Sequence, residues 1–130
     1  MSFLTVPLAS NHKKKAFVCG KSLLDDYFYT QAKQDVTKRV SACFVLSEED
    51  QTVKGYYTLS SATIQHELLP EEILKRLPPS YSNLPVTLLG RLAIDIHYQG
   101  KGIGELILLD ALKRSFVASS IVGSMAVVVD

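Results

Sequence analysis

Hydrophobic and polar residues recur along the chain with two different periods, which predict strands in some segments and helices in others. Residues 2–8 predict a short first strand. Residues 40–47 and 52–64 are rich in β-branched and aromatic residues, and the polar sequence EEDQ between them predicts an antiparallel hairpin. Residues 86–95 form an apolar run too continuous to leave one face in water, so this strand is expected inside the sheet.

Three segments predict helices. Ser22 and Asp25 have the spacing of a capping box and open a predicted helix over residues 22–36. A short helix is predicted over residues 70–76, because Pro78 and Pro79 follow and stop it. The third helix follows a glycine-rich segment near residue 100. One arc of this helix is expected to pack on the sheet and the other to face mostly water: the first holds Ile107, Leu108, Ala111, Leu112 and Phe116, and the second holds Glu105, Asp110, Lys113 and Arg114.

A last strand is predicted over residues 120–130, the sequence SIVGSMAVVVD. Because a helix connects it to the strand at 86–95, the crossover predicts that these two strands are parallel. We therefore expect an α+β fold, an α/β three-layer arrangement with a mixed, mostly antiparallel sheet and flanking helices. The length of 130 residues fits a single domain, residues 1–130.

Charge is distributed unevenly although the whole chain carries only +1. Residues 1–40 contain seven lysine and arginine residues against three aspartates, a net charge of +4, so the other 90 residues carry −3. A basic first third suits an anionic partner such as RNA, and it also suits a plain solvated surface. The candidate RNA contacts are Lys13, Lys14, Lys15, Lys33, Lys38 and Arg39.

Cys19 and Cys43 have no metal-ligand spacing and form no disulfide framework, so we expect two buried thiols, a reducing cytoplasm and no metal site. No apolar run approaches the ~18 residues that a membrane span needs, and the first residues do not have the charge order of a signal peptide. The chain is therefore expected to have no membrane segment.

Three glycines stand at alternate positions, Gly100, Gly102 and Gly104, between the strand at 86–95 and the long helix. A helix N-terminus offers unpaired N–H groups and the positive end of the helix dipole, and glycines permit positive φ angles and a close approach of the backbone. This arrangement suits a pyrophosphate, with Lys101 adding a positive charge. A structural turn is the alternative. The spacing matches neither GxGxxG, since residue 105 is Glu105, nor a P-loop.

The sequence Gln-x-x-Gly-x-Gly, from Gln99 to Gly104, resembles motif A of the GNAT family of N-acetyltransferases. The segments FVCGKSLLDDYFYTQAKQD, GYYTLSSATI, LLGRLAID and QGKGIGELILLDALKRS extend the likeness over the whole chain. They resemble the toxins of bacterial toxin–antitoxin pairs that acetylate the amino group of aminoacyl-tRNA. The resemblance implies acetyl-CoA as co-substrate, aminoacyl-tRNA as acceptor and a ribbon-helix-helix antitoxin as partner.

The resemblance also implies which residues hold acetyl-CoA. The backbone of Leu92, Ala93 and Ile94 would pair with the pantetheine arm, while a plain core strand has the same sequence. The pyrophosphate would be held by Gln99, Gly100, Lys101, Gly102, Ile103 and Gly104, with Glu105 in the first helical turn.

The catalytic acid of the resembled toxins is a tyrosine on a helix after the strand that here ends near Asp130. The resemblance thus implies that the last helix and the final two strands lie beyond this chain, and no catalytic residue is assigned in it. Tyr56 and Tyr57 are expected in the core or a cleft wall, and His97 is expected on the surface beside the glycines. The last strand would then be an uncovered edge, which predicts a homodimer or an edge-paired oligomer.

Two functions stay open at this point. The first is an N-acetyltransferase, acting on aminoacyl-tRNA or, alternatively, on a small amine or a protein terminus. The second is a non-catalytic module that binds CoA or an antitoxin.

Overall fold

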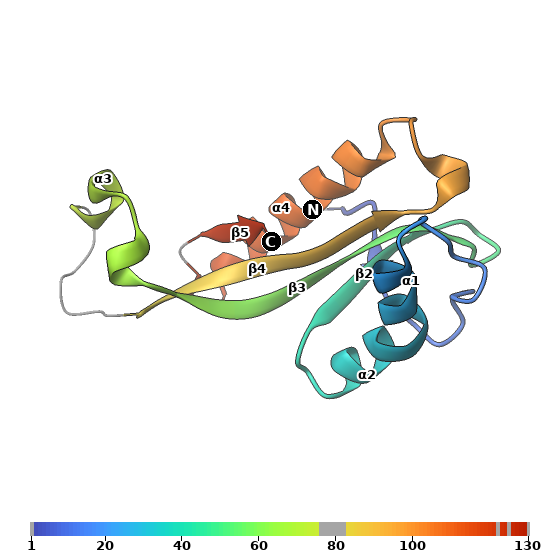
Figure 1. Cartoon of the computed structure of the whole chain (residues 1–130), viewed down its shortest axis with the longest axis horizontal. Helices are drawn as coiled ribbons and strands as arrows, with labels where there is room; N and C mark the ends of the chain where they lie inside the picture. The colour runs from blue at the N-terminus through green and yellow to red at the C-terminus, as the bar shows by residue number, and fades with distance from the viewer. Residues whose placement is uncertain (1, 76–82, 122, 125, 130) are drawn as a thin grey trace.

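The computed structural model describes residues 2–75, 83–121, 123–124 and 126–129. Its centre is a five-stranded sheet in the order β1-β2-β3-β4-β5 (Figure 1). The first four strands are antiparallel neighbours and β5 runs parallel to β4, which confirms the predicted hairpin and crossover. The strands are β1 (Val6–Pro7), β2 (Ala42–Ser47), β3 (Val53–Gln65), β4 (Asn83–Ile94) and β5 (Val127–Val129).

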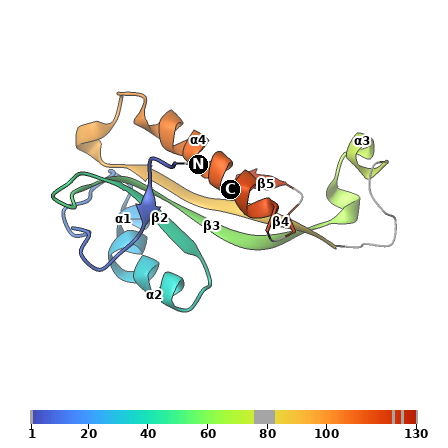
Figure 2. The ribbon, with the colours of Figure 1, turned by 180° about the vertical axis from the view of Figure 1, so that it is seen from behind.

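Helices cover both faces of the sheet, so the predicted α+β fold with three layers is confirmed (Figures 1 and 2). One face carries a continuous helical segment made of α1 (Ser22–Asp26), η1 (Tyr27–Gln31) and α2 (Ala32–Thr37). The other face carries α4 (Ile103–Ser119), which follows the short helix η3 (Ile96–Tyr98). At the far end of β3 lie η2 (His66–Leu68) and α3 (Glu71–Leu74), so the predicted helix at 70–76 is shorter, and residue 76 and both prolines lie outside the described residues.

The first strand is shorter than the predicted residues 2–8 because the residues before it bind a helix instead of β2. The backbone N–H of Leu4 donates to Oδ1 of Asp110 at 2.7 Å, and the hydroxyl of Thr5 donates to Oδ2 of the same carboxylate. Val6 and Pro7 pair with β2, and the backbone N–H of Leu8 adds one hydrogen bond to the Cys43 carbonyl oxygen at 2.9 Å. The start of the chain is therefore fixed to α4 by polar contacts rather than by sheet pairing.

The predicted exposed arc of α4 is wrong at Asp110, whose exposed fraction is 4%. Ile107 and Ala111 are buried as expected, whereas Phe116, expected in the core, is 73% exposed. The polar side chain lies inside because the sheet and the N-terminal segment supply it with donors: Tyr57 donates its hydroxyl to Asp110 at 2.8 Å. A buried carboxylate with several donors can replace an apolar residue at a helix–sheet contact.

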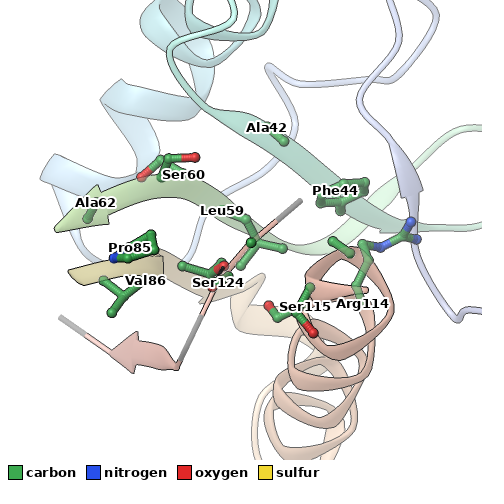
Figure 3. A pocket seen from close by; sticks show the side chains of 15 residues that line it. Ala42, Phe44, Leu59, Ser60, Ala62, Pro85, Val86, Arg114, Ser115 and Ser124 are labelled. Carbon is green, nitrogen blue, oxygen red and sulfur yellow. Dashed lines mark hydrogen bonds between the residues drawn. The ribbon is translucent and has the colours of Figure 1, made fainter. Parts of the chain in front are cut away.

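Arg114 completes this buried polar network. Its Nε donates to the Tyr57 hydroxyl at 3.0 Å, and its guanidinium also donates to the Thr5 carbonyl oxygen at 2.7 Å. Figure 3 shows Arg114 reaching from α4 toward Phe44 of β2, and the guanidinium lies 4.0 Å from the centre of that ring. Burial raises the pKa of Asp110, but hydrogen bonds from Thr5, Leu4 and Tyr57 and the charge of Arg114 hold it below its usual value.

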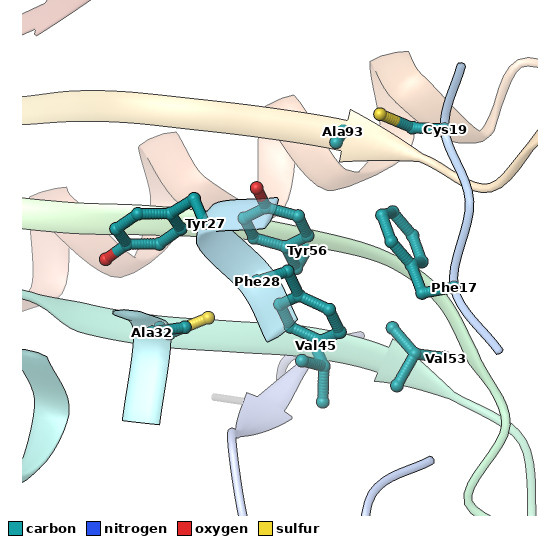
Figure 4. Close-up of a cluster of buried hydrophobic side chains, with 10 residues drawn as sticks. Phe17, Cys19, Tyr27, Phe28, Ala32, Val45, Val53, Tyr56 and Ala93 are labelled. Carbon is teal, nitrogen blue, oxygen red and sulfur yellow. The ribbon is translucent and has the colours of Figure 1, made fainter. Parts of the chain in front are cut away.

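The opposite face of the sheet packs against the helical segment of residues 22–37 through aromatic side chains (Figure 4). Phe28 stacks on Tyr56 with ring centres 4.5 Å apart, and both side chains are fully buried. Cys19 and Cys43 are free and buried, as the sequence predicts, and burial raises the pKa of Cys43 to about 12. These thiols are packing groups.

The helical segment begins differently from the predicted capping box. Ser22 is its first residue, and the capping residue Lys21 makes no side-chain cap. Asp25 instead accepts a hydrogen bond from the backbone N–H of Cys19 at 2.8 Å. Its carboxylate thus fixes the chain before the helix, and a π-helical turn at Tyr27–Gln31 interrupts the regular spacing.

Replacing the Asp110 carboxylate tests the buried polar network. In Asp110→Asn we expect a loss of about 1–3 kcal/mol in the free energy of unfolding at neutral pH, since the donors of Thr5, Leu4 and Tyr57 lose a charged acceptor. Because the folded-state pKa is lowered, the wild-type stability from this group is present above the unfolded value of about 4 and falls as the pH decreases through the folded value. Chemical denaturation at several pH values measures both effects. Glu105→Gln, exposed on the same helix, is the control, and equal stability of the two variants would contradict the assignment.

The outer edge of β5 is the second testable feature. Within the described residues no strand pairs with that edge, and Val129 is 63% exposed. Unpaired edges of apolar strands seek partners, so we expect concentration-dependent self-association that Val129→Lys reduces. Ile121→Lys, which alters an exposed apolar residue outside the strand, should change it less. Light scattering at several concentrations is the measurement, and a monodisperse wild-type monomer would contradict this prediction.

Candidate functional site

The glycine-rich turn lies directly between η3 and α4 and has the backbone that the sequence predicts. Gly100 and Gly102 have φ angles of +76° and +77°, a region that side chains disfavour. A Cβ atom added at either position would meet no protein atom within 4 Å, so the space in front of the turn is open. Gly102 caps α4 without any side-chain hydrogen bond. The first amides of α4 therefore face open space, which suits an anion.

β4 leads to this turn with one edge uncovered. Its pairing with β5 covers only Thr87 to Leu89, whereas its pairing with β3 continues to Ile94. The register with β3 shifts between Arg91 and Leu89, so Gly90 is an extra, bulged residue at the point where β5 ends. Among the described residues, the β4 edge from Gly90 to Ile94 has no strand partner. Below, "β4 edge" means these five residues.

The predicted strand residues on this edge have their side chains in the two cores. Ala93 is buried against the helical segment of residues 22–37, and Leu92 and Ile94 pack toward α4. Only backbone atoms of the edge are thus available to a neighbour, as the sequence predicts for Leu92 to Ile94.

The side-chain amide of Gln99 is hydrogen-bonded within the protein. Its amide nitrogen donates to the carbonyl oxygens of Ile94 and Cys19, both at 2.8 Å. The side chain therefore holds the end of β4 next to the loop before α1. Lys101 and Glu105 are exposed at the turn, and the backbone amide of Glu105, rather than its negative side chain, suits an anion.

Asp95 is a residue of this region that the sequence did not reveal. Its carboxylate accepts from the backbone N–H of Val18 at 3.1 Å and of His97 at 2.9 Å, and Nδ1 of the His97 ring lies 2.8 Å away. Burial raises the pKa of Asp95, but these hydrogen bonds outweigh it and hold the pKa below its usual value. His97 is 76% exposed, which confirms its expected surface position, and Asp95 is a carboxylate that orients its ring.

Two clefts lie on opposite faces of the sheet. The first, of about 330 Å³, separates the end of α4 from β2, β3 and β4, with Phe44, Leu59, Val86 and Arg114 in its wall (Figure 3). The second, of about 660 Å³, lies between the helical segment of residues 22–37 and the sheet. We name it the helix-side cleft; its wall includes Leu23, Leu24, Asp26, Tyr27, Thr30, Asp35, Val40, Ser41, Thr58, Ser60, Leu88, Gly90 and Arg91. The bulge at Gly90 connects this cleft with the β4 edge.

The predicted RNA-contacting residues form two separate groups. Lys13 pairs with Thr52 and lies 3.7 Å from Asp50, beside the β2–β3 turn. Lys33, Lys38 and Arg39 are exposed at the other end of the hairpin, where Arg39 borders a groove shared with Ala42 and Leu59. This second group lies beside the helix-side cleft, and Lys14 and Lys15 belong with Lys13.

The described tyrosines are committed to protein partners. Tyr56 donates to the Leu24 carbonyl oxygen at 2.7 Å, Tyr27 to Asp35 at 2.8 Å and Tyr98 to Glu48 at 3.1 Å. Tyr29 donates to the Phe17 carbonyl oxygen, and burial raises the pKa of Tyr57 to about 12. Tyr56 and Tyr57 are core residues, as expected. Tyr81 lies outside the described residues.

The histidines and acidic residues suggest no further centre. His12 is buried and accepts a backbone hydrogen bond from Ala9 at 2.9 Å, so it shapes a turn, while nothing is described of the His66 side chain. In residues 2–75 and the described residues after 82, no group of three His, Cys, Asp or Glu residues could hold a metal ion. None of the described helices has the length and apolarity needed to cross a bilayer.

No protein-family model matches the chain, but individual proteins do. It is 34% identical over 114 residues to a tRNA-acetylating toxin of Mycobacterium tuberculosis, over 88% of this chain and 66% of the relative. It is 30% identical over 126 residues to the probable toxin TacT of Sinorhizobium fredii, over 95% of this chain and 69% of that protein. The chain belongs to the family of GNAT-type tRNA-acetylating toxins. It spans about two thirds of the length of these curated relatives.

Solved structures of the family superimpose on the described fold. AtaT in complex with acetyl-methionyl-tRNAfMet matches with a TM-score of 0.88 and 27% identity, over 98% of this chain and 77% of that chain. AtaTR bound with acetyl-CoA matches with a TM-score of 0.83 and 28% identity, over 97% of this chain and 75% of that chain. The toxin fold predicted from the sequence is thus confirmed for this chain.

Proposed function

We propose that the chain forms the acetyl-CoA-binding part of an N-acetyltransferase that acetylates the α-amine of aminoacyl-tRNA. The observation that carries this proposal is the continuous path from the bulge at Gly90, along the β4 edge, to the open glycine turn at the start of α4. An extended arm that ends in a pyrophosphate fits such a path. The names of the relatives, a tRNA-acetylating toxin and AtaT with acetylated methionyl-tRNA, supply the acceptor class.

In this proposal the backbone does most of the binding. The amides at Gly100, Gly102 and the first turn of α4 hold the pyrophosphate, with Lys101 contributing a solvent-screened charge. The backbone of Leu92, Ala93 and Ile94 pairs with the pantetheine arm. Gln99 positions the turn through its hydrogen bonds to Ile94 and Cys19 rather than by touching the phosphates.

When bound, acetyl-CoA supplies a thioester carbonyl that a neutral amine can attack. The new C–N bond forms as the C–S bond breaks, the sulfur leaves as thiolate or thiol, and the amine loses a proton. The acetylated amine is neither charged nor nucleophilic, so a tRNA modified in this way cannot continue peptide synthesis. The proposed toxin role includes an antitoxin partner and a cytoplasmic site of action.

A second candidate is a module that binds CoA without turnover. The observation in its favour is that the hydroxyls of the five described tyrosines all donate to protein atoms, so none of them is free to protonate a departing thiolate. Calorimetric titration with CoA beside an assay for acetyl transfer separates the two candidates. Binding with transfer to charged tRNA supports the enzyme, and binding without transfer to any amine supports the module.

Gly102→Val tests the phosphate-binding turn. We expect it to abolish CoA binding, because a β-branched residue disfavours the positive φ angle and places atoms in the space that the pyrophosphate needs. Lys101→Ala should only weaken binding. Calorimetry gives the affinities, and circular dichroism checks that the fold is kept. CoA binding by Gly102→Val equal to that of the wild type would contradict the proposed site.

Charge reversal tests each basic group separately. Changing Lys33, Lys38 and Arg39 to glutamate, or Lys13, Lys14 and Lys15 to glutamate, should lower tRNA affinity. A plot of the logarithm of the binding constant against the logarithm of the salt concentration should also become less steep. The expected change in slope is roughly 0.7–0.9 for each phosphate that the variant no longer neutralises. CoA affinity should stay constant in both variants. Filter binding at several salt concentrations measures the slopes. A group whose reversal leaves the slope unchanged is a solvated surface and does not bind RNA.

A further inference from the structure

Arg91 occupies a distinctive place in the helix-side cleft. It follows the bulged Gly90 on β4, and its side chain lies on the cleft side of the sheet with Tyr27. Its guanidinium lies 3.6 Å from the centre of the Tyr27 ring, a stacking distance. The residue is half-buried, so part of its hydration is lost.

The hydrogen-bonding groups of Arg91 are not used within the described part of the protein. No described atom accepts a hydrogen bond from its guanidinium, and no described carboxylate lies within salt-bridge distance. Arg114 on the other face is the internal comparison, since it donates to Tyr57 and Thr5 and lies 4.0 Å from Asp110. A half-buried, stacked arginine with unused donors is suited to bind an oxyanion of a ligand.

Tyr27 positions the Arg91 guanidinium by stacking, and Asp35 in turn fixes the Tyr27 ring. The Tyr27 hydroxyl donates to Asp35 at 2.8 Å, and Gln31 donates to the other oxygen of that carboxylate at 3.0 Å. Hydrogen bonds from Gln31 and Tyr27 lower the pKa of Asp35, while burial and the contact with Asp35 raise the pKa of Tyr27 to about 12. The tyrosine therefore stays a neutral donor near pH 7. Its ring is held at one end by the helix backbone and at the other by the hydrogen bond of its hydroxyl to Asp35.

The cleft holds charges of both signs, and Arg91 is close enough to Asp35 for its charge to help lower the pKa of that carboxyl. Asp26 and Asp35 lie on the helical wall, and Arg91 lies on the strand that forms the floor, beside the neutral Thr58 and Ser60. A ligand with both an amine and an anionic group fits this arrangement better than a purely anionic or purely cationic one. The groove at Arg39 shares Val40, Ser41 and Ser60 with the cleft, so positive charge continues outward from it.

We propose that Arg91, held by Tyr27, binds the phosphate on the 5′ side of the aminoacylated terminal nucleotide. This inference rests on the proposed function, since it identifies the part of the acceptor that the cleft recognises. The amine of the acceptor then lies near Gly90, where the helix-side cleft meets the β4 edge, and the rest of the acceptor strand leaves toward Lys38 and Arg39. Arg91 is a specificity residue in this arrangement and takes no part in bond making.

Two stable probes test this inference on the full chain with CoA present. Both are 3′-aminoacylamino-3′-deoxyadenosines, in which an amide replaces the labile ester, and only one carries a 5′-phosphate. We expect the wild type to bind the phosphorylated probe about tenfold or more tightly, the effect of charge-assisted hydrogen bonds. Arg91→Gln should lose this preference, and circular dichroism checks that its fold is kept. Lys75→Gln, which removes an exposed charge just after α3, should keep the preference in full.

Further variants separate a binding role from a folding role. Arg91→Lys keeps a point charge without the planar fork and should retain part of the preference. Tyr27→Leu removes the stacked ring and should reduce the preference, with Tyr27→Phe between it and the wild type. Equal binding of the two probes by the wild type, or an undiminished preference in folded Arg91→Gln, would overturn the inference. A phosphate preference that depends on Arg91, together with no acetyl transfer to charged tRNA, would support this site and contradict the proposed function.

Discussion

The incomplete pairing of β4 is the constraint on which the rest of the site depends. From Thr87 to Leu89 the strand has a neighbour on each side, and from Gly90 onward only β3 remains within the described residues. Unpaired backbone groups are costly when buried, so a strand that loses a neighbour must expose that edge or offer it to a ligand. The bulge at Gly90 makes the change of pairing local, since it shifts the register with β3 by one residue without ending that pairing.

α4 must keep a fixed position along the sheet, because otherwise the glycine turn at its start would not lie next to the β4 edge. Its contact with the sheet contains Ile107 and Ala111, but apolar packing alone allows a helix to slide or rotate. Asp110 and Arg114 fix the position and rotation of the helix through directional hydrogen bonds. Their partners are Tyr57 on β3 and Thr5 and Leu4 at the start of the chain. The buried polar network thus connects three distant parts of the sequence, and at the other end of α4 Gln99 joins the turn to Ile94 and Cys19.

Local patterns in the sequence were sufficient for the order of the strands, the hairpin, the crossover and the positive φ angles of the glycine turn. They overestimated the lengths of the outer strands, since β1 is Val6–Pro7 rather than 2–8 and β5 is Val127–Val129 rather than 120–130. They failed where a distant partner decides the outcome. Helical periodicity predicted that Asp110 faces water. Its hydrogen-bond donors Thr5 and Tyr57 are far away in the sequence, so no local pattern indicates them. The apolar pattern of residues 86–95 does not place the bulge, and its one sequence signal is the glycine inside the strand, Gly90. The role of Asp95 depends on Val18, far away in the chain. The resemblance to a family predicted the cofactor-binding segment, and only the fold revealed that the basic residues form two groups.

The two faces of the sheet divide the proposed chemistry between them. On one side, backbone groups of the β4 edge and of α4 suit a long, anionic cofactor; on the other, the helix-side cleft offers a guanidinium, two carboxylates and an apolar wall. Gly90 joins the two because there the β4 backbone leaves its regular pairing with β3. The groups around that glycine can bind and orient an amine, but every described tyrosine hydroxyl nearby already donates to the protein. Binding and proton transfer are therefore separable in the proposed mechanism: the described residues supply the affinity for both substrates, and the acid that protonates the thiolate must come from a group with a free proton.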